Sequence, residues 1–561
     1  MSVQRLKRTV SAPIAKPRSV AAPAVATKGE RAFVLDVPFA MRAFASAEGA
    51  RWDPAHSVYV YRGSALPPSL APFRPGAYAW ERWVERELND EDEVPSPAAA
   101  PTMTPRPHQR EAIAAIIAAR AAKRAGFLLA DDVGLGKTVT AWESIRAMPD
   151  CKTVLIVCPL AVIAHWRRTV QALGDGGRRV VLINYERLGK LFEVSAEARK
   201  KVKSKKGLAR AGSATEFDVI VWDESHRCKN PAAARSKFAV KLNAKASFVL
   251  WLSATAGQNP LELSYLAPLL ASVTGSRAAD LKDFEQWCVD QGLGVTRGTF
   301  GRWNWRGDPA DCERVHAMLF EGRAPAGLRR RPEDIAGWPE LQRILTPIEL
   351  DASARQLYDQ AWTAFRAEMA LDPRGKNPQS ALTAMLRLRQ KSSIIRVAGT
   401  LELARELLEN GHQVAISVAF TETLTMLRDA LQAESVPCAA LYGAQPAREK
   451  EAERMRFQRG DAKVIVFTVE EGISLHQGEH NEAPRSEVIH DVRWSAIQMA
   501  QIEGRCHRDG RFAQVYWTYA DATLEEQIAT IVCKRLLAMK SMVGDDVETL
   551  REIEQLLASG A

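Results

Sequence analysis

The sequence lacks paired cysteines and long apolar runs, and each absence excludes a class of protein. Its eight Cys stand singly, and none belongs to a CxxC pair. That pattern argues against a zinc ribbon or a disulfide framework and suits a reducing compartment. No apolar run approaches the ~20 residues that a membrane span needs. Hydrophobic residues at 46% and charged residues at 25% exclude wholesale disorder. We therefore expect a soluble, cytoplasmic protein without zinc and without a membrane partner.

Positive charge is in excess but is unevenly placed. The formal net charge of the 561 residues is +9. Residues 1–29 hold six basic side chains and no acid, and residues 190–210 hold eight basic residues and two acids, so the rest of the chain is slightly acidic. A basic excess points to a polyanionic partner. Since two short segments supply it, charge alone is weak evidence for such a partner.

The chain divides by composition into seven segments. Two apolar strand series, rich in Val, Ile and Leu and alternating with helix-like stretches, predict two α/β lobes with parallel sheets. A small α+β module precedes them, with an expected strand, a helix and a hairpin that turns at Asp53-Pro54. The predicted segments are a disordered tail (1–29), the module (30–80), a Pro-rich linker (81–104), lobe 1 (105–274), a spacer (275–345), lobe 2 (346–545) and a C-terminal tail (546–561).

Ten apolar runs carry the strand predictions, five in each lobe. Each ends in polar or glycine-rich residues, as strands of α/β domains do. In the spacer, by contrast, Trp and Arg are frequent and no strand series is evident. The runs are GFLLA (126–130), TVLIVCP (153–159), RVVLINY (179–185), DVIVWDE (218–224) and FVLWLSAT (248–255), then QVAISVAF (413–420), VPCAALYG (436–443), AKVIVFTV (462–469), SEVIHDV (486–492) and AQVYWTYA (513–520).

A glycine-rich loop follows the first of these runs. Residues 131–138 read DDVGLGKT and precede a helix-like stretch. In such a strand–loop–helix setting, backbone N–H groups cradle phosphates. Gly134 and Gly136 permit the turn, Lys137 is expected to reach the β/γ-phosphates, and the Thr138 hydroxyl to ligate Mg²⁺. The generic pattern has Gly where Asp131 stands, but the core GLGKT outweighs that departure.

An acidic pair follows the strand run VIVW. Asp223 and Glu224 therefore fall at the carboxyl edge of the first predicted sheet. Asp223 is suited to hold Mg²⁺ and Glu224 to polarise the attacking water as general base. A lone acidic pair after a strand is as often a solvated strand end. Together with the upstream phosphate loop, it indicates nucleotide hydrolysis.

A basic string in lobe 2 supplies a third element. QIEGRCHRDGR (501–511) places Arg505 and Arg508 three residues apart, on one face if the stretch is helical. Positive charge delivered to a γ-phosphate accelerates phosphoryl transfer by about 10³–10⁵-fold. We predict that these arginines complete the site from the second lobe.

Together these strings resemble the helicase-like motor of superfamily-2 ATPases, specifically the Swi/Snf-type DNA translocases. The resemblance covers roughly residues 105–535, with the motifs in the family's order. It implies two tandem RecA-like lobes, ATP with Mg²⁺, and DNA contact through 154–166 and 183–186. It further implies an adenine-sensing Gln109, coupling residues between ATP and DNA (His226, Ser253, Thr255, Gly472 and Gln501), and a basic inter-lobe segment containing Arg329, Arg330 and Arg331.

Some motifs depart from the family pattern. TVEEGISL (468–475) keeps Gly472 but carries Glu470 and Glu471 where small residues are common, and the last motif ends in Asp509-Gly510-Arg511. The sequences of these two motifs most resemble those of the annealing-helicase branch of the family. Residues 32–75 are similar to the HARP-type module beside those motors, and equally to a small bacterial and phage domain of unknown function.

Several residues keep two interpretations. Lys200, Lys201 and Lys203 either contact DNA or lie in a solvated loop, and Arg329–Arg331 either contact the DNA backbone or brace the lobes. Trp303 and Trp305, interleaved with Arg302 and Arg306, suit nucleic acid or docking on their own domain. Trp166, Trp222 and Trp251 are expected in the core.

We predict a DNA-stimulated ATPase, of the helicase and translocase type, that moves along double-stranded DNA. The first alternative is a strand-annealing or fork-remodelling helicase with forked DNA as its partner. The second is a scaffold on which ATP only sets a conformation. A bacterial or phage-infected cell is the expected setting, and protein partners are not predicted.

Overall fold

The computed structural model divides the chain into two compact units. Unit 1 comprises Met1–Gly76 and Val84–Glu91, and unit 2 comprises Ala77–Trp83 and Asp92–Ala561. The structure describes residues 30–91, 103–132, 134–193, 204–254, 260–276, 284–297, 303–322, 325–339, 342–370, 378–468, 473–477, 480–494, 496–507 and 510–538. Among the helices of these residues, none has both the length and the apolar character needed to cross a bilayer.

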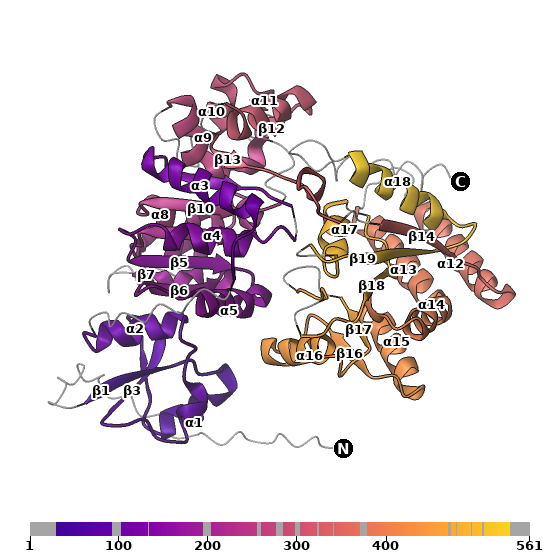
Figure 1. Cartoon of the computed structure of the whole chain (residues 1–561), viewed down its shortest axis with the longest axis horizontal. Helices are drawn as coiled ribbons and strands as arrows, with labels where there is room; N and C mark the ends of the chain where they lie inside the picture. The colour runs from indigo at the N-terminus through magenta and orange to yellow at the C-terminus, as the bar shows by residue number, and fades with distance from the viewer. Residues whose placement is uncertain are drawn as a thin grey trace, which may run out of the picture. The chain divides into compact units, whose positions relative to one another are not determined.

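Unit 1 is a small α+β module, as predicted (Figure 1). Its antiparallel sheet has the order β1-β3-β2, and Asp53 caps the predicted turn by accepting a hydrogen bond from Ala55 N at 2.8 Å. Leu35, Ala45 and Leu70 are buried at its centre. The elements are β1 (Arg31–Leu35), η1 (Phe39–Met41), α1 (Arg42–Ala47), β2 (Arg51–Asp53), β3 (Val58–Gly63) and η2 (Ala71–Phe73).

A helix, α2 (Trp80–Leu88), lies where the sequence predicts the beginning of a linker. Its sequence WERWVEREL is typical of an acidic, solvated segment, but two of its glutamates are buried and form ion pairs. Glu81 pairs with Lys190 at 2.6 Å and with Arg187. Glu85 pairs with Arg74 and accepts a hydrogen bond from Val34 N at 2.9 Å. Because each carboxylate has a partner, it can be buried in a helix that the acidic composition does not reveal.

Lobe 1 is a parallel sheet covered on both faces. Its order is β13-β4-β10-β9-β5-β6. Helices α3, α4 and α5 pack on one face through Ile116, Trp142 and Trp166. The strands are β4 (Gly126–Leu129), β5 (Thr153–Cys158), β6 (Arg179–Asn184), β9 (Val219–Asp223), β10 (Phe248–Leu252) and β13 (Gly327–Leu328). The helices are α3 (Pro107–Ala121), α4 (Lys137–Arg146), α5 (Ile163–Leu173), α7 (Lys205–Ala211), α8 (Ala234–Asn243), α9 (Ala267–Thr274), α10 (Phe284–Asp290) and α11 (Pro309–Phe320).

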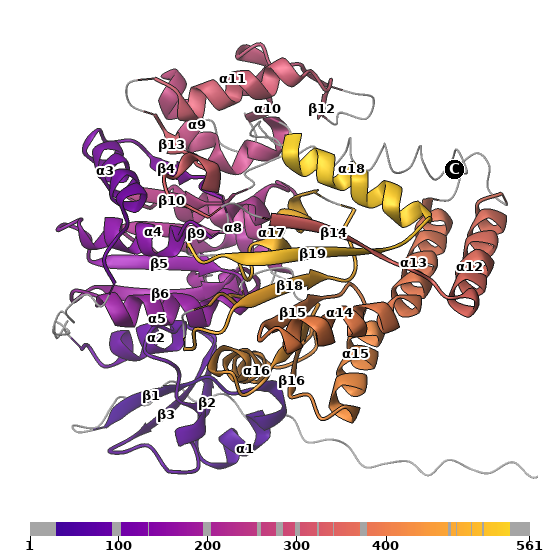
Figure 2. The ribbon, with the colours of Figure 1, turned by 45° about the vertical axis from the view of Figure 1, so that its right-hand side comes forward.

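Lobe 2 repeats this three-layer plan. Its parallel sheet has the order β14-β19-β18-β15-β17-β16, and Figure 2 shows β14, β19 and β18 side by side. Helices α16, α17 and α18 cover one face, and α14 and α15 the other. The strands are β14 (Gln342–Ile348), β15 (Gln413–Ser417), β16 (Cys438–Leu441), β17 (Val464–Phe467), β18 (Arg485–Ile489) and β19 (Ala513–Ala520). The helices are α12 (Ala352–Ala370), α13 (Pro378–Ile395), α14 (Val397–Glu409), α15 (Thr421–Ala433), α16 (Ala447–Arg459), α17 (Ala496–Glu503) and α18 (Leu524–Ala538).

All ten predicted runs form strands, but other strands were not predicted. The predicted spacer contains β13, the hairpin β11 (Val295–Arg297) with β12 (Trp303–Trp305), and the beginning of β14. Lobe 1 also has a two-residue pair, β7 (Phe192–Glu193) with β8 (Ser213–Ala214). In β12, the Trp305 indole donates to Asp311 at 2.7 Å, which favours docking on its own domain for that residue.

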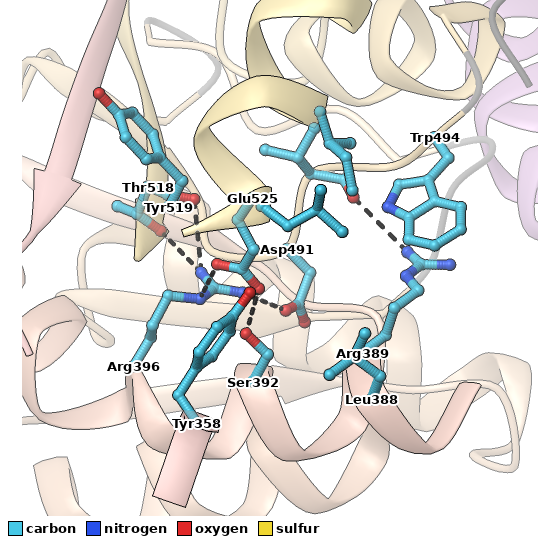
Figure 3. Close-up of a pocket in the computed structure, with 13 residues that line it drawn as sticks. Tyr358, Leu388, Arg389, Ser392, Arg396, Asp491, Trp494, Thr518, Tyr519 and Glu525 are labelled. Atoms are coloured by element: carbon cyan, nitrogen blue, oxygen red, sulfur yellow. Dashed lines mark hydrogen bonds and ion pairs between the residues drawn. The ribbon is translucent and has the colours of Figure 1, made fainter. Parts of the chain in front are cut away.

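An ion network fills the carboxyl edge of the lobe 2 sheet beside a pocket (Figure 3). Arg396, buried between α13 and α14, pairs with Asp491 at 3.0 Å and with Glu525 at 2.8 Å. Ser392 donates to the same Glu525. Removing one partner would leave a buried charge unpaired and destabilise the fold by about 3–5 kcal/mol. The network therefore fixes how α13, β18 and α18 pack together.

Candidate nucleotide-binding site

The loop after β4 has the conformation of a phosphate cradle. Gly134 and Gly136 have φ of +90° and +80°, a region that side chains disfavour. A Cβ at Gly136 would lie 2.3 Å from Nε2 of Gln109. The loop leads directly into α4, whose first residue is Lys137, so the loop adjoins the first N–H groups of the helix, which have no partner within it.

Gln109, predicted to sense adenine, lies against this loop. Its Nε2 donates to Leu135 O at 3.4 Å and to Gly136 O at 3.3 Å, while its Oε1 accepts from Arg106 N at 2.8 Å. Helix α3 therefore begins at the phosphate loop, held there by the predicted residue.

Lys137 is held by the carbonyls of its own loop. Its Nζ donates to Asp131 O at 2.6 Å and to Asp132 O at 3.1 Å. The neighbouring Thr138 is buried in the first turn of α4. The ammonium and the hydroxyl predicted to meet phosphate and metal thus project from adjacent positions.

The acidic pair lies at the carboxyl end of β9, and its second residue has a strained backbone. Asp223 is buried, whereas Glu224 has φ 54° and ψ 52°, the left-handed region that non-glycine residues rarely adopt. Tyr185 Oη donates to Asp223 O at 2.8 Å and to Glu224 O at 3.2 Å. The Trp166 indole donates to Asp223 Oδ2 at 2.7 Å. Backbone and carboxylate are therefore both fixed.

Burial, with the neighbouring charge of Glu224, raises the pKa of Asp223 to about 6, against an opposing effect of Lys137. A buried carboxylate beside a second, half-buried one favours a cation next to them. Hard oxygen donors of this kind, with the Thr138 hydroxyl, fit Mg²⁺ when nucleotide phosphates supply further ligands. Among the described residues no group of three His, Cys, Asp or Glu could hold a metal ion.

Two predicted coupling residues meet beside this pair. Strand β10 lies between β4 and β9, and Ser253 follows it directly. His226 Nδ1 lies 3.0 Å from Ser253 Oγ and 3.3 Å from a carboxylate oxygen of Glu224. The carboxyl edges of β4, β10 and β9 therefore gather the phosphate loop, His226, Ser253 and the acidic pair. Thr255 lies outside the described residues.

The predicted DNA-contact residues behave differently from one another. Arg330 is buried and pairs with Asp131, which favours the bracing interpretation for that residue. Burial also lowers the pKa of Arg329, whereas Arg331 is half-buried. Lys200, Lys201 and Lys203 lie outside the described residues, so their predicted DNA contact remains a prediction.

In lobe 2, Arg505 is turned inward. It is buried after α17, and its Nη1 donates to Ile473 O at 3.1 Å. Arg454 and Arg485 donate to the next two carbonyls, at Ser474 (3.1 Å) and Leu475 (3.2 Å). Three arginines thus clamp residues 473–475, directly after the predicted Gly472. Gln501 is buried in α17; Gly472 and Arg508 lie outside the described residues.

A buried carboxylate, Glu487 on β18, lies beside the Arg505 backbone turn. Its Oε2 accepts a hydrogen bond from Cys506 N at 3.1 Å. Burial raises its pKa to about 8, with Glu503 adding to the shift and Arg505 opposing it.

We expect Glu487→Gln to stabilise the protein in a pH-dependent way. The raised pKa keeps Glu487 protonated in the folded state between about pH 4.5 and 8, so wild-type stability falls as the pH rises through that window. The variant's stability relative to wild type should therefore rise from pH 5 to pH 8, by an amount on the order of 2–4 kcal/mol. Urea unfolding at a series of pH values measures this; a constant difference would contradict it.

Sequence reasoning missed the residues that orient the site. Trp166 was expected only in the core, and it is fully buried, but its indole N–H also holds Asp223. Tyr185 carries no local signal for its two hydrogen bonds. A buried Trp or Tyr needs a partner for its polar atom, which is the one sequence-level hint available.

For the ATP hydrolysis predicted from the sequence, we expect Trp166→Phe to lower kcat about ten-fold and to raise the Mg²⁺ concentration that gives the half-maximal rate. The ring remains, but Asp223 loses its donor, and outer partners of metal ligands commonly contribute at this level. Trp142→Phe is the matched control, because that buried indole donates instead to Gly174 O at 3.1 Å. An unchanged Mg²⁺ dependence in Trp166→Phe would contradict the assignment.

Comparison with known proteins assigns both lobes. The model of the SNF2-related domain matches residues 108–394, and that of the helicase conserved C-terminal domain matches residues 399–510. Among curated relatives, a chromodomain-helicase-DNA-binding protein 3 homolog of Caenorhabditis elegans is 23% identical over 73% of this chain and 25% of its own length. An uncharacterized ATP-dependent helicase of Mycoplasma genitalium is 23% identical over 77% of this chain and 42% of its own length.

A SWI/SNF-related matrix-associated actin-dependent regulator of chromatin subfamily A-like protein 1 of Xenopus tropicalis is 22% identical over 73% of this chain and 42% of that protein. The chain thus spans less than half the length of these relatives. Among solved structures, the Sulfolobus solfataricus SWI2/SNF2 ATPase core in complex with dsDNA matches with 19% identity and a TM-score of 0.32, covering 82% of this chain and 98% of that one.

Proposed function

The chain belongs to the SNF2-related domain family, and on that premise we propose that it is a DNA-stimulated ATPase that translocates on double-stranded DNA. The observation that carries the proposal is the gathering of a phosphate loop and a strained acidic pair at the carboxyl edges of β4, β10 and β9. A glycine loop that binds nothing has no need of a buried aspartate and a strained glutamate beside it.

Each residue has a distinct role in this proposal. The loop N–H groups and Lys137 bind the phosphates, and Gln109 contacts the base. Thr138 and Asp223 hold Mg²⁺, which when bound neutralises phosphate charge. Glu224 takes a proton from the attacking water. The 3.3 Å approach of His226 to Glu224 and its 3.0 Å contact with Ser253 give the general base a link to the rest of lobe 1.

Coupling to DNA requires the second lobe. We expect Arg508 to reach the γ-phosphate when the lobes close, so that closure depends on the intact nucleotide. Arg505, predicted from the sequence to share this role, is instead held inside lobe 2 by Ile473 O. DNA is expected to bind mainly through phosphate contacts, with steep salt dependence and little sequence preference. The names of relatives, which include an ATP-dependent helicase and a helicase-DNA-binding protein, agree with this direction.

The test is the ATPase rate of the full chain at matched salt with no DNA, single-stranded DNA, duplex DNA, forked DNA and RNA. The proposal expects the greatest stimulation by duplex DNA, and loss of hydrolysis in Lys137→Ala with every nucleic acid. Stimulation by RNA alone would overturn the DNA assignment. Hydrolysis that survives Lys137→Ala would overturn the site itself.

A second candidate, fork remodelling, is favoured by the surface of unit 1. Phe39 is 83% exposed and Trp52 is 47% exposed. The guanidinium of Arg42 lies 5.1 Å from the Phe39 ring centroid and 5.8 Å from that of Trp52. Exposed aromatic rings interleaved with arginine suit stacking on unpaired bases.

The double variant Phe39→Ala/Trp52→Ala separates the two candidates. Fork remodelling expects it to lower stimulation by forked DNA while stimulation by linear duplex stays as in wild type. An equal effect on both substrates would argue against junction recognition and leave the duplex translocase as the better account.

A further inference from the structure

Arg330 connects the segment between the lobes to the phosphate loop. Its guanidinium makes a two-pronged contact with the Asp131 carboxylate, Nε to Oδ1 at 3.1 Å and Nη2 to Oδ2 at 2.6 Å. Both side chains are buried, Asp131 almost completely. A paired, planar contact of this kind is strong and geometrically specific.

The same guanidinium reaches a second element of the site. Its Nη1 donates to His108 O, next to Gln109, at 2.5 Å and lies 3.4 Å from Glu111. Eight residues after Arg330, the Trp338 ring packs edge-on against the His108 ring, with the two ring centroids 5.5 Å apart. The inter-lobe segment is thus fastened to the beginning of α3 as well as to the loop.

The backbone carries the connection further. Arg330 O accepts a hydrogen bond from Asp132 N at 2.9 Å, which continues the pairing of β13 with β4 into the phosphate loop. Asp131 O in turn accepts from Lys137 Nζ at 2.6 Å. Asp131 therefore stands between Arg330 on one side and the phosphate-binding lysine on the other.

This arrangement explains the departure from the generic loop pattern. A glycine at position 131 would leave Arg330 without its buried carboxylate and with only the exposed Glu111 nearby, and removing the partner of a buried charge is costly. We propose that the Arg330–Asp131 pair is a positioning device that sets the phosphate loop and Lys137, and through which movement of the inter-lobe segment changes ATP affinity. The inference rests on the proposed function of the loop in ATP binding.

The test uses Arg330→Gln, Asp131→Asn and the double variant in the full chain. Each single variant should raise KM for ATP about ten-fold, with a smaller effect on kcat. The double variant should be no worse than either single one, because both remove the same contact. Arg330→Lys, which keeps the charge but not the fork, should fall between wild type and Arg330→Gln.

A second readout needs no nucleotide. Amide hydrogen exchange should rise at 126–132 and at 327–331 in Arg330→Gln and in Asp131→Asn, since the loop loses its anchor. Arg405→Gln is the matched control: it breaks an exposed arginine–carboxylate pair, with Glu434 at 2.6 Å, and should alter neither KM nor this exchange. If Arg330→Gln does not fold, the nearly isosteric Asp131→Asn carries the test.

The outcomes separate the inference from the proposed function. Wild-type protein that neither binds nor hydrolyses ATP would defeat the proposed function. Normal wild-type turnover with additive single-variant effects, or with unchanged KM and exchange, would overturn the inference alone. Weaker DNA binding and a shallower salt dependence in Arg330→Gln, at unchanged KM for ATP, would make Arg330 a DNA contact and also overturn it.

Discussion

Glu224→Gln is expected to lower the kcat of the proposed DNA-stimulated ATP hydrolysis by about 10²–10⁴-fold, the usual contribution of a general base, while ATP still binds. The substitution keeps the size of the side chain and its left-handed backbone and removes only the carboxylate that we propose accepts the proton. Lys137 and the glycines of the loop keep their contacts, so a fluorescent ATP analogue should bind with near wild-type affinity.

The lower rate expected for Glu224→Gln cannot come from protonation of Asp223. Burial is the main cause of the raised pKa of Asp223, and the charge of Glu224 raises that pKa further. Removing that charge makes Asp223 easier to ionise, which favours metal binding. A lower rate in Glu224→Gln therefore reports the missing base and not a protonated metal ligand.

The control is Glu434→Gln, which alters an exposed glutamate paired with Arg405 and should leave turnover unchanged. Turnover of Glu224→Gln within about ten-fold of wild type would reject Glu224 as the base. His226, 3.3 Å away, would then be the next residue to examine.

The strands could be predicted because each one carries its own signal. A strand covered on both faces is an unbroken apolar run, and the ten such runs in the sequence all form strands. β14 was missed because it is an edge strand with several exposed positions and contains Pro347, which only an edge tolerates. β13, with two residues, has no pattern to detect.

The site divides in the same way. The phosphate loop and the acidic pair are contiguous motifs, so their residues could be named in advance. The contacts that orient them join distant positions: Trp166 and Asp223 are 57 residues apart, and Arg330 and Asp131 are 199 apart. The local sequence around either residue does not predict its partner. Only the order of the strands in the sheet brings the two residues together.

Arg508→Ala is expected to keep ATP binding and to lower the DNA-stimulated rate by about 10³-fold or more, as loss of an arginine finger does. We assign it the direct role because Arg505 is only 4% exposed and is used inside lobe 2, where it holds Ile473 O. Arg508→Lys, with charge but no planar fork, should recover a small part of the rate.

Arg505→Ala should behave differently, because it removes one of the three arginines that clamp residues 473–475. It should lower the melting temperature as well as the rate, whereas Arg508→Ala should leave the melting temperature unchanged. Rates with saturating ATP and duplex DNA, taken with thermal melts of both variants, separate a charge delivered to phosphate from a charge that holds the fold. Normal hydrolysis by Arg508→Ala would refute the trans-lobe assignment, and an unchanged melt of Arg505→Ala would refute the positioning role.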